Sequence, residues 1–162
     1  INFDLLQTEL GEDYVILFRS HYFIANEFDF SKYKGFLFDV SKYDEINNLY
    51  LVSDLLITDY SSVFFDFANL KKPMIFYMYD YDTYKHQLRD FYIDLEELPG
   101  PIIKEENEME LCLKIKNIRQ EQKKYQKKYE NFHKKYNYLD DKDCSRKVLE
   151  ECVFHAEDKT DC

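Results

Sequence analysis

The chain has 162 residues, of which 45% are hydrophobic and 18% aromatic, so it has enough apolar side chains for one compact domain and is not expected to be disordered. Its formal charge of −10 argues against general binding of nucleic acid. No apolar run approaches the roughly 18 residues of a membrane-spanning helix, and the first residues lack the basic start and apolar stretch of a signal peptide.

Four nearly continuous apolar runs in the first half of the chain have the length of strands. They are Tyr14–Phe18, Gly35–Val40, Asp54–Thr58 and Pro73–Met78. Strands that are covered on both faces are continuously apolar, whereas half-exposed strands alternate. Segments of helical length separate the runs. The sequence therefore predicts an α/β fold, an open Rossmann-like parallel sheet with flanking helices and right-handed βαβ crossovers.

Five segments between and after these strands are predicted to be helices: 43–52, 62–70, 105–116, 120–136 and 144–154. In the first segment Ile46, Leu49 and Tyr50 fall on one helical face. The third has acidic residues first and lysines last, as the helix dipole favours. Residues 99–101 are Pro-Gly-Pro and are predicted to form a loop before it.

Ligands of an open parallel sheet bind beyond the carboxyl ends of its strands. This rule selects the residues that follow the four runs: Arg19–Tyr22, Ser41–Tyr43, Asp59–Ser62 and Tyr79–Asp82. Arg19 offers a fork of donors for phosphate oxygens, and His21 can donate to a phosphate or carry a proton. From spacing alone, an ordinary surface histidine is a slightly favoured alternative for His21.

The segment Thr58–Ser62, TDYSS, joins a predicted strand to a predicted helix. Ser61 and Ser62 are suited to capping this helix, to binding a phosphate beside the free amides at its start, or to one role each. Asp59 would repel a bound phosphate, so we expect it to orient the loop. Asp66 lies one helical turn after Ser62. It either shares the exposed rim, by which we mean the surface beyond the carboxyl ends of the strands, or is a solvated helix residue.

Several common sites are absent from the sequence. The three glycines form neither a dinucleotide-binding fingerprint nor a Walker A loop, and there is no GxSxG nucleophile elbow. The cysteines and histidines lack the spacing of metal ligands, so we expect no metal and no cofactor, and we expect the cysteines to be reduced thiols. Any nucleotide must then be held by side chains and helix ends.

Charge is unevenly distributed along the chain. Between Lys116 and Lys135 there are eight Lys or Arg residues and two Glu, a local charge of +6 that leaves −16 elsewhere. The basic helix predicted within residues 116–136 either faces an anionic polymer or membrane surface, or packs an aromatic stripe inward with its lysines in solvent. The stripe consists of Tyr125, Tyr129, Phe132 and Tyr136.

A longer pattern surrounds these motifs. The run from RSH at Arg19–His21 through DVSKYDEINNLYLVSDLLITDYSSVFFDFANLKKPMIFYMYDYDTY to ELPGP, with YNYLDDKDCSRKVLE near the end, closely resembles the CDP-glycerol glycerophosphotransferase family, which polymerises teichoic acids. Family enzymes are similar to two-domain glycosyltransferases of the GT-B type. The resemblance implies that residues 1–162 are the single C-terminal domain that binds the donor nucleotide. Since the chain begins at Ile1 rather than at Met, we expect it to be a piece of a longer protein.

The resemblance also implies roles for individual residues. His21 matches a functional histidine expected near the donor pyrophosphate, and Ser61 and Ser62 match a serine pair that binds donor phosphate. Asp66 matches an aspartate expected near the donor glycerol, and Arg19 is carried over as a further substrate-binding residue. The base of the family reaction is a second histidine in the N-terminal domain, and no residue of this chain matches it.

The implied reaction is attack by the terminal hydroxyl of a glycerol-phosphate chain on the β-phosphate of CDP-glycerol, with release of CMP. The expected partners are CDP-glycerol, a polyol-phosphate acceptor, the N-terminal domain of the same protein and an anionic membrane surface. We expect a cytoplasmic protein, peripheral on the inner face of the bacterial membrane, whose 162 residues alone bind donor weakly without turning it over. A transferase of ribitol phosphate or capsule polymer and a non-catalytic nucleotide-binding or interaction module are the alternatives.

Overall fold

The computed structural model describes residues 1–20, 28–81 and 93–154. Its strands are β1 (Ile16–Phe18), β2 (Leu37–Asp39), β3 (Leu56–Thr58), β4 (Met74–Tyr77) and β5 (Ile102–Ile103). β1 pairs with β2, and β3, β4 and β5 form a second sheet in that order, with every pair parallel. This confirms the predicted α/β class. Within the described residues the strands form two sheets rather than one, and β5 was not predicted.

The helices are α1 (Phe3–Leu10), α2 (Ile46–Val52), α3 (Val63–Ala68), α5 (Glu108–Lys116), α6 (Ile118–Tyr136) and α7 (Cys144–Leu149). Short 3-10 turns occupy Phe30–Tyr33 and Leu95–Glu97, and a π-helical segment, Glu150–Phe154, continues α7. All five predicted helices are present. α1 was not predicted; it begins where the Asn2 side chain accepts a hydrogen bond from the Leu5 amide (3.1 Å).

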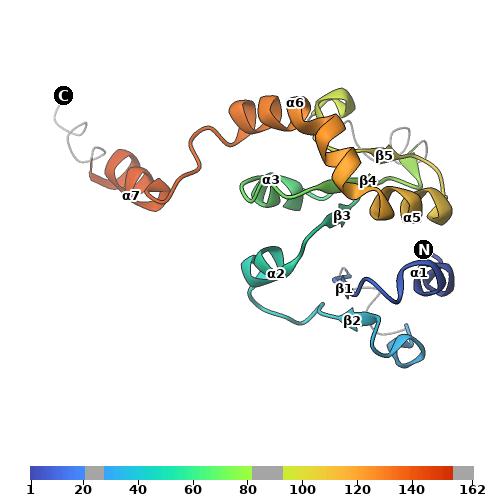
Figure 1. Ribbon diagram of the computed structural model, residues 1–162. Coiled ribbons are helices and arrows are strands. Elements are labelled where there is room, and N and C mark those ends of the chain that lie inside the picture. The colour runs from blue at the N-terminus through green and yellow to red at the C-terminus, as the bar shows by residue number, and fades with distance from the viewer. Residues whose placement is uncertain (21–27, 82–92, 155–162) are drawn as a thin grey trace.

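Helices lie beside both sheets, and one stands apart. In Figure 1, α5 and α6 lie next to β4 and β5, α1 lies near β1, and α7 projects away from the rest of the molecule. None of the helices in the described ranges is long and apolar enough to cross a bilayer.

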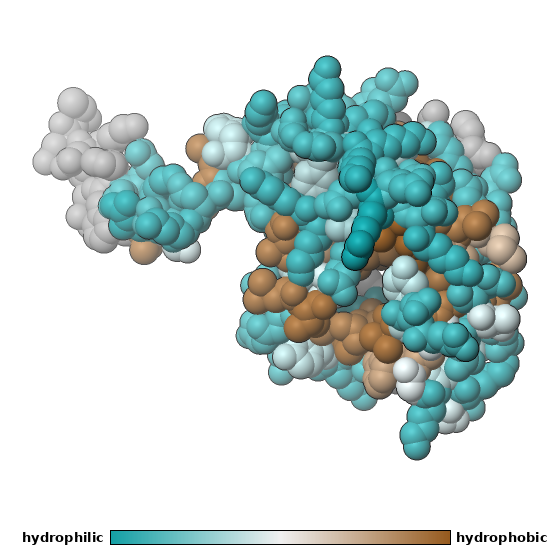
Figure 2. Space-filling view, viewed as in Figure 1, coloured by the Kyte–Doolittle hydropathy of each residue, from teal (hydrophilic) through white to brown (hydrophobic). Residues whose placement is uncertain are grey.

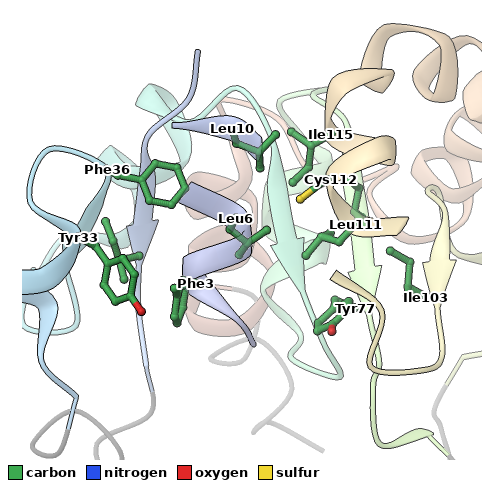
Figure 3. Close-up of a cluster of buried hydrophobic side chains, with 12 residues drawn as sticks. Phe3, Leu6, Leu10, Tyr33, Phe36, Tyr77, Ile103, Leu111, Cys112 and Ile115 are labelled. Carbon is green, nitrogen blue, oxygen red and sulfur yellow. The ribbon is translucent and has the colours of Figure 1, made fainter. Parts of the chain in front are cut away.

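β4 separates two hydrophobic cores. Because side chains alternate along a strand, Ile75 and Tyr77 point into one core and Met74 and Phe76 into the other. Figure 3 shows the first core, where side chains of α1 and α5 meet those of the strands. All four residues of β4 are buried, as its continuous apolar run predicts.

The other strands are less covered than predicted. Phe38 in β2 is 45% exposed and Ile57 in β3 is 37% exposed, so the expectation of cover on both faces is wrong for these strands. Figure 2 shows apolar surface around α2 and the neighbouring strands, in contrast to the hydrophilic surface around α6.

The aromatic stripe of α6 packs inward. Tyr129 and Phe132 are buried, and the rings of Phe132 and Tyr136 lie 5.5 and 5.4 Å from that of Phe65 in α3. The Tyr129 hydroxyl lies 2.9 Å from the carbonyl oxygen of Lys72 and donates to it. This packing confirms the inward stripe and ties α6 to the turn between α3 and β4.

Candidate functional site

Arg19 directly follows β1 and is exposed at the predicted rim. Its Nη1 donates to the Tyr43 carbonyl oxygen at 2.5 Å, which anchors the side chain to the segment after β2. A guanidinium has five N–H donors, so this contact leaves donors for a ligand. His21, the predicted catalytic residue, lies outside the described residues.

The ends of β1 and β2 are joined by serines. The Ser20 amide donates to Ser41 Oγ at 3.0 Å, and the two hydroxyl oxygens lie 3.2 Å apart. The Asp39 carboxylate accepts from the Ser41 amide at 2.9 Å, and the hydrogen bonds from Ser41 hold the pKa of Asp39 below its usual range. These bonds give the rim a defined shape on this side.

The TDYSS segment joins β3 to α3 as predicted, but Ser62 does not cap the helix with its side chain. Ser62 occupies the N-cap position with helical backbone angles, and its hydroxyl makes no capping bond. Asp59 Oδ1 accepts a hydrogen bond from the Ser61 amide at 3.1 Å, so Asp59 orients the loop, as expected. Both serines are exposed. Both side chains are therefore accessible at the rim.

Tyr50, in the last turn of α2, is influenced by the charges of both Arg19 and Asp66. Burial raises the pKa of Tyr50, the negative charge of Asp66 raises it further, and the positive charge of Arg19 lowers it. Both charges thus act on one hydroxyl, although Asp66 and Arg19 are 47 positions apart in the sequence (66 minus 19). Tyr50 is 8% exposed, and its hydroxyl has no hydrogen-bond partner in the described part of the chain.

The Tyr50 hydroxyl is a candidate site residue that motifs in the sequence did not indicate. Its position in the sequence suggested only a core contact, because Ile46, Leu49 and Tyr50 fit the apolar face of a helix. A buried hydroxyl that lacks a partner loses about 1–3 kcal/mol of hydrogen bonding to water. A bound ligand with a polar group at this point would supply the missing partner.

The ends of β4 and β5 complete the rim. The Tyr60 hydroxyl donates to Asp80 Oδ1 at 2.8 Å, and burial together with that carboxylate raises the pKa of Tyr60 well above its usual range. Lys104 directly follows β5, and its Nζ lies 4.4 Å from the centre of the Tyr81 ring. The strand-end rule would have selected Lys104 if the two-residue strand β5 had been visible in the sequence.

The rim mixes charge of both signs with hydroxyl groups. Asp59, Asp66 and Asp80 supply carboxylates, whereas Arg19 and Lys104 supply positive charge. Cations and serine hydroxyls stabilise phosphate oxygens, and carboxylates accept hydrogen bonds from sugar or polyol hydroxyls. This combination suits a ligand that carries both kinds of group. Within the ranges that the structure describes, no cluster of three or more His, Cys, Asp or Glu side chains could hold a metal ion.

Residues 1–154 match the model of the CDP-Glycerol:Poly(glycerophosphate) glycerophosphotransferase family. The chain belongs to this family. The chain is 47% identical over 153 residues to the teichoic acid poly(glycerol phosphate) polymerase of Bacillus subtilis (strain 168). It is 44% identical over 153 residues to the teichoic acid glycerol-phosphate transferase of Staphylococcus aureus (strain NCTC 8325 / PS 47). These alignments cover 94% and 93% of this chain.

The fold of this family member is also that of a solved structure. It matches the wall teichoic acid polymerase TagF with a TM-score of 0.85 and 41% sequence identity, over 99% of this chain and 39% of that chain. A TagF variant soaked with CDPG matches equally well, with a TM-score of 0.85 and 42% identity over 98% of this chain and 38% of that one. The chain spans 20% of the Bacillus subtilis relative and 38% of the Staphylococcus aureus relative.

Proposed function

We propose that this chain is the donor-binding part of a glycerophosphotransferase, which holds CDP-glycerol at the carboxyl ends of its strands. In the complete protein, glycerol phosphate would pass from CDP-glycerol to a teichoic acid or related polymer, with release of CMP. The observation that carries the proposal is the family match over residues 1–154, which includes Arg19, Ser61, Ser62 and Asp66.

The chemistry of these exposed side chains supports a different role for each of them in donor binding. Ser61 and Ser62 are exposed and would donate to phosphate oxygens, and Arg19, which is also exposed, would add positive charge. Asp66 would accept hydrogen bonds from the glycerol hydroxyls. The Tyr50 hydroxyl, which both charged residues influence, would donate to the ligand between them.

In the proposed reaction, a bond forms between the acceptor hydroxyl oxygen and the β-phosphorus as the bond to the CMP oxygen breaks. The serines and Arg19 would stabilise the negative charge that builds up on the pyrophosphate. By the family resemblance, His21 assists at the pyrophosphate, and the hydroxyl proton goes to a base in another part of the protein. We therefore expect these residues to bind the donor without turning it over.

Removal of the serine hydroxyls tests this proposal. In Ser61→Ala/Ser62→Ala, two charge-assisted hydrogen bonds would be lost, so we expect CDP-glycerol affinity to fall at least about tenfold in isothermal titration calorimetry. Because Ser62 makes no capping bond, we expect the unfolding free energy to change by less than about 0.5 kcal/mol.

An exposed serine of α7, Ser145, provides the control. Ser145→Ala should leave donor affinity unchanged, because α7 lies far from the rim (Figure 1). Equal affinity of the double variant and the unaltered chain would contradict the site assignment. The same titration with His21→Ala, which the resemblance predicts to weaken binding, separates the histidine from the serines.

A specific observation also favours a second substrate. The chain is 40% identical over 161 residues, 98% of its length, to the teichoic acid poly(ribitol-phosphate) polymerase of Bacillus spizizenii (strain ATCC 23059 / NRRL B-14472 / W23). The two candidate donors share the CDP group and differ in the polyol. Titration of CDP-glycerol against CDP-ribitol decides between them, and tighter binding of CDP-ribitol would replace glycerol in the proposal.

We further propose that the complete protein works in the cytoplasm at the inner face of the membrane. The support is chemical: a nucleotide-activated donor is a cytoplasmic substrate, and a cell-surface polymer leaves through the membrane. Fractionation of cells that express the complete protein checks this placement.

A further inference from the structure

A groove of about 710 Å³ runs along α6, opposite the turn that carries Lys71. Arg119, Lys123 and Lys134 line it from the helix, together with His133, and Glu130 is its one carboxylate. The groove therefore holds four Lys or Arg side chains against a single acidic one. Nothing in the donor site uses these residues.

The cations of the groove differ from other cations nearby. Lys114, Lys116 and Lys135 are paired with the carboxylates of Glu121, Glu9 and Glu97. By contrast, the four groove cations have no ion-pair or hydrogen-bond partner for their charged groups among the residues that the structure describes. Their positive charge is therefore available to an external anion.

The two walls of the groove are held together. The Tyr129 hydroxyl donates to the Lys72 carbonyl oxygen at 2.9 Å, and Gln122 Nε2 donates to the Lys71 carbonyl oxygen at 3.2 Å. Lys71 adopts a left-handed backbone conformation with φ of 54°, which costs a residue with a side chain about 1–2 kcal/mol. The turn is therefore fixed against α6 before any ligand arrives.

We propose that this groove binds a linear phosphodiester polymer, as an acceptor-holding site separate from the donor site. A polyanionic strand matches both the elongated shape and the excess of positive charge. A membrane surface is a poorer match, because an interfacial helix needs large apolar side chains at its exposed face. None of the exposed large apolar side chains in the described ranges belongs to α6, and Figure 2 shows hydrophilic surface there.

The position of the groove limits what part of the polymer it holds. Lys71 precedes β4, whereas Ser61 follows β3, and these strands run parallel with Leu56 opposite Met74. The groove thus lies toward the amino ends of the strands, and the serine pair lies toward their carboxyl ends. The groove would hold polymer that is already made, while the reacting end reaches the donor. This assignment to the acceptor rests on the proposed function.

The test compares two charge-reversal variants of the 162-residue chain. Lys123→Glu/Lys134→Glu alters the groove, and Lys124→Glu/Lys127→Glu makes the same change in net charge outside its lining. The probe is a fluorescently labelled glycerol phosphate oligomer, titrated at several salt concentrations. We expect the groove variant to bind on the order of tenfold more weakly than the control variant, and affinity to fall as salt rises. Circular dichroism melting shows whether both variants fold.

Each outcome bears on the proposal. Equal loss of oligomer binding in both variants, or no loss in the groove variant, overturns it. Binding to phosphatidylglycerol vesicles that depends on Lys123 and Lys134, with no binding of oligomer, overturns it in favour of a membrane contact. CDP-glycerol titration separates the two sites: oligomer binding without donor binding contradicts the proposed function and leaves the groove supported, and the reverse result contradicts the groove alone.

Discussion

The hydroxyl of Tyr50 should stabilise ligand binding and destabilise the free chain. In Tyr50→Phe the ring keeps its edge-on contact with Phe67, whose centroid is 5.7 Å away, and only the buried hydroxyl is removed. The hydroxyl loses about 1–3 kcal/mol of hydrogen bonding in the free chain. We therefore expect the unfolding free energy to rise by about 1 kcal/mol, and the melting temperature by roughly 2–4 °C.

Donor binding should change in the opposite direction. If the Tyr50 hydroxyl donates to a charged oxygen of the donor, its removal costs about 1.5–3 kcal/mol, or roughly 10- to 100-fold in CDP-glycerol affinity. Urea unfolding and isothermal titration calorimetry on the same variant measure the two effects. A gain of stability together with a loss of affinity is the expected signature of an unpartnered hydroxyl in a binding site.

Tyr129→Phe is the matched control. Its hydroxyl has a partner, the Lys72 carbonyl oxygen, and lies at the other edge of the sheet. We expect this variant to lose about 1 kcal/mol of stability and to keep its donor affinity. Tyr50→Phe that destabilises the chain as much as Tyr129→Phe would refute the reasoning, because the Tyr50 hydroxyl would then have a stabilising partner in the free chain.

Two further predictions concern stability. Burial raises the pKa of Glu108, but hydrogen bonds from the Asn2 amide (2.9 Å) and its own amide outweigh this and hold the pKa below its ordinary value of 4.5. This contribution to the unfolding free energy is present above pH 4.5 and is lost as the pH falls through the lower pKa of the folded chain. In urea unfolding at a series of pH values, Glu108→Gln should therefore make the unfolding free energy fall less steeply on the acid side. An unchanged steepness would contradict this prediction. A Cβ at Gly100 would lie 2.1 Å from the Met74 carbonyl oxygen, so Gly100→Ala should lose about 3 kcal/mol in urea unfolding. Gly35→Ala, where space is open but φ is +87°, should lose only about 1 kcal/mol, and equal losses would contradict the clash.

Local patterns in the sequence account for most of the elements. Each of the four apolar runs contains a strand, because continuous apolar character reflects burial that neighbouring residues share. The ends were less predictable: the run Gly35–Val40 contains only the three-residue strand Leu37–Asp39. β5 has two residues, too few to form a pattern, and is a strand only because β4 supplies its hydrogen-bond partners.

Part of the candidate site could likewise be predicted from the sequence, and part could not. The strand-end rule and the family pattern selected Arg19, Ser61, Ser62 and Asp66 from sequence, because parallel strands bring their carboxyl ends to one edge. Local spacing allowed Ser62 to cap α3, but the backbone at the junction leaves its hydroxyl without a capping bond. A capping bond depends on backbone angles, which residue types alone do not specify.

The sequence by itself determined the fold class and the family, since both follow from local runs and motifs, and it also selected part of the rim, namely Arg19, Ser61, Ser62 and Asp66. Only the tertiary structure decided that the Tyr50 hydroxyl is buried under the influence of Asp66 and Arg19, and that four cations of the basic region line one groove. The physical reason is that burial, partners and charge environment depend on segments distant in the sequence. The turn at Lys71 faces α6 residues about fifty positions later, and no local pattern records that contact.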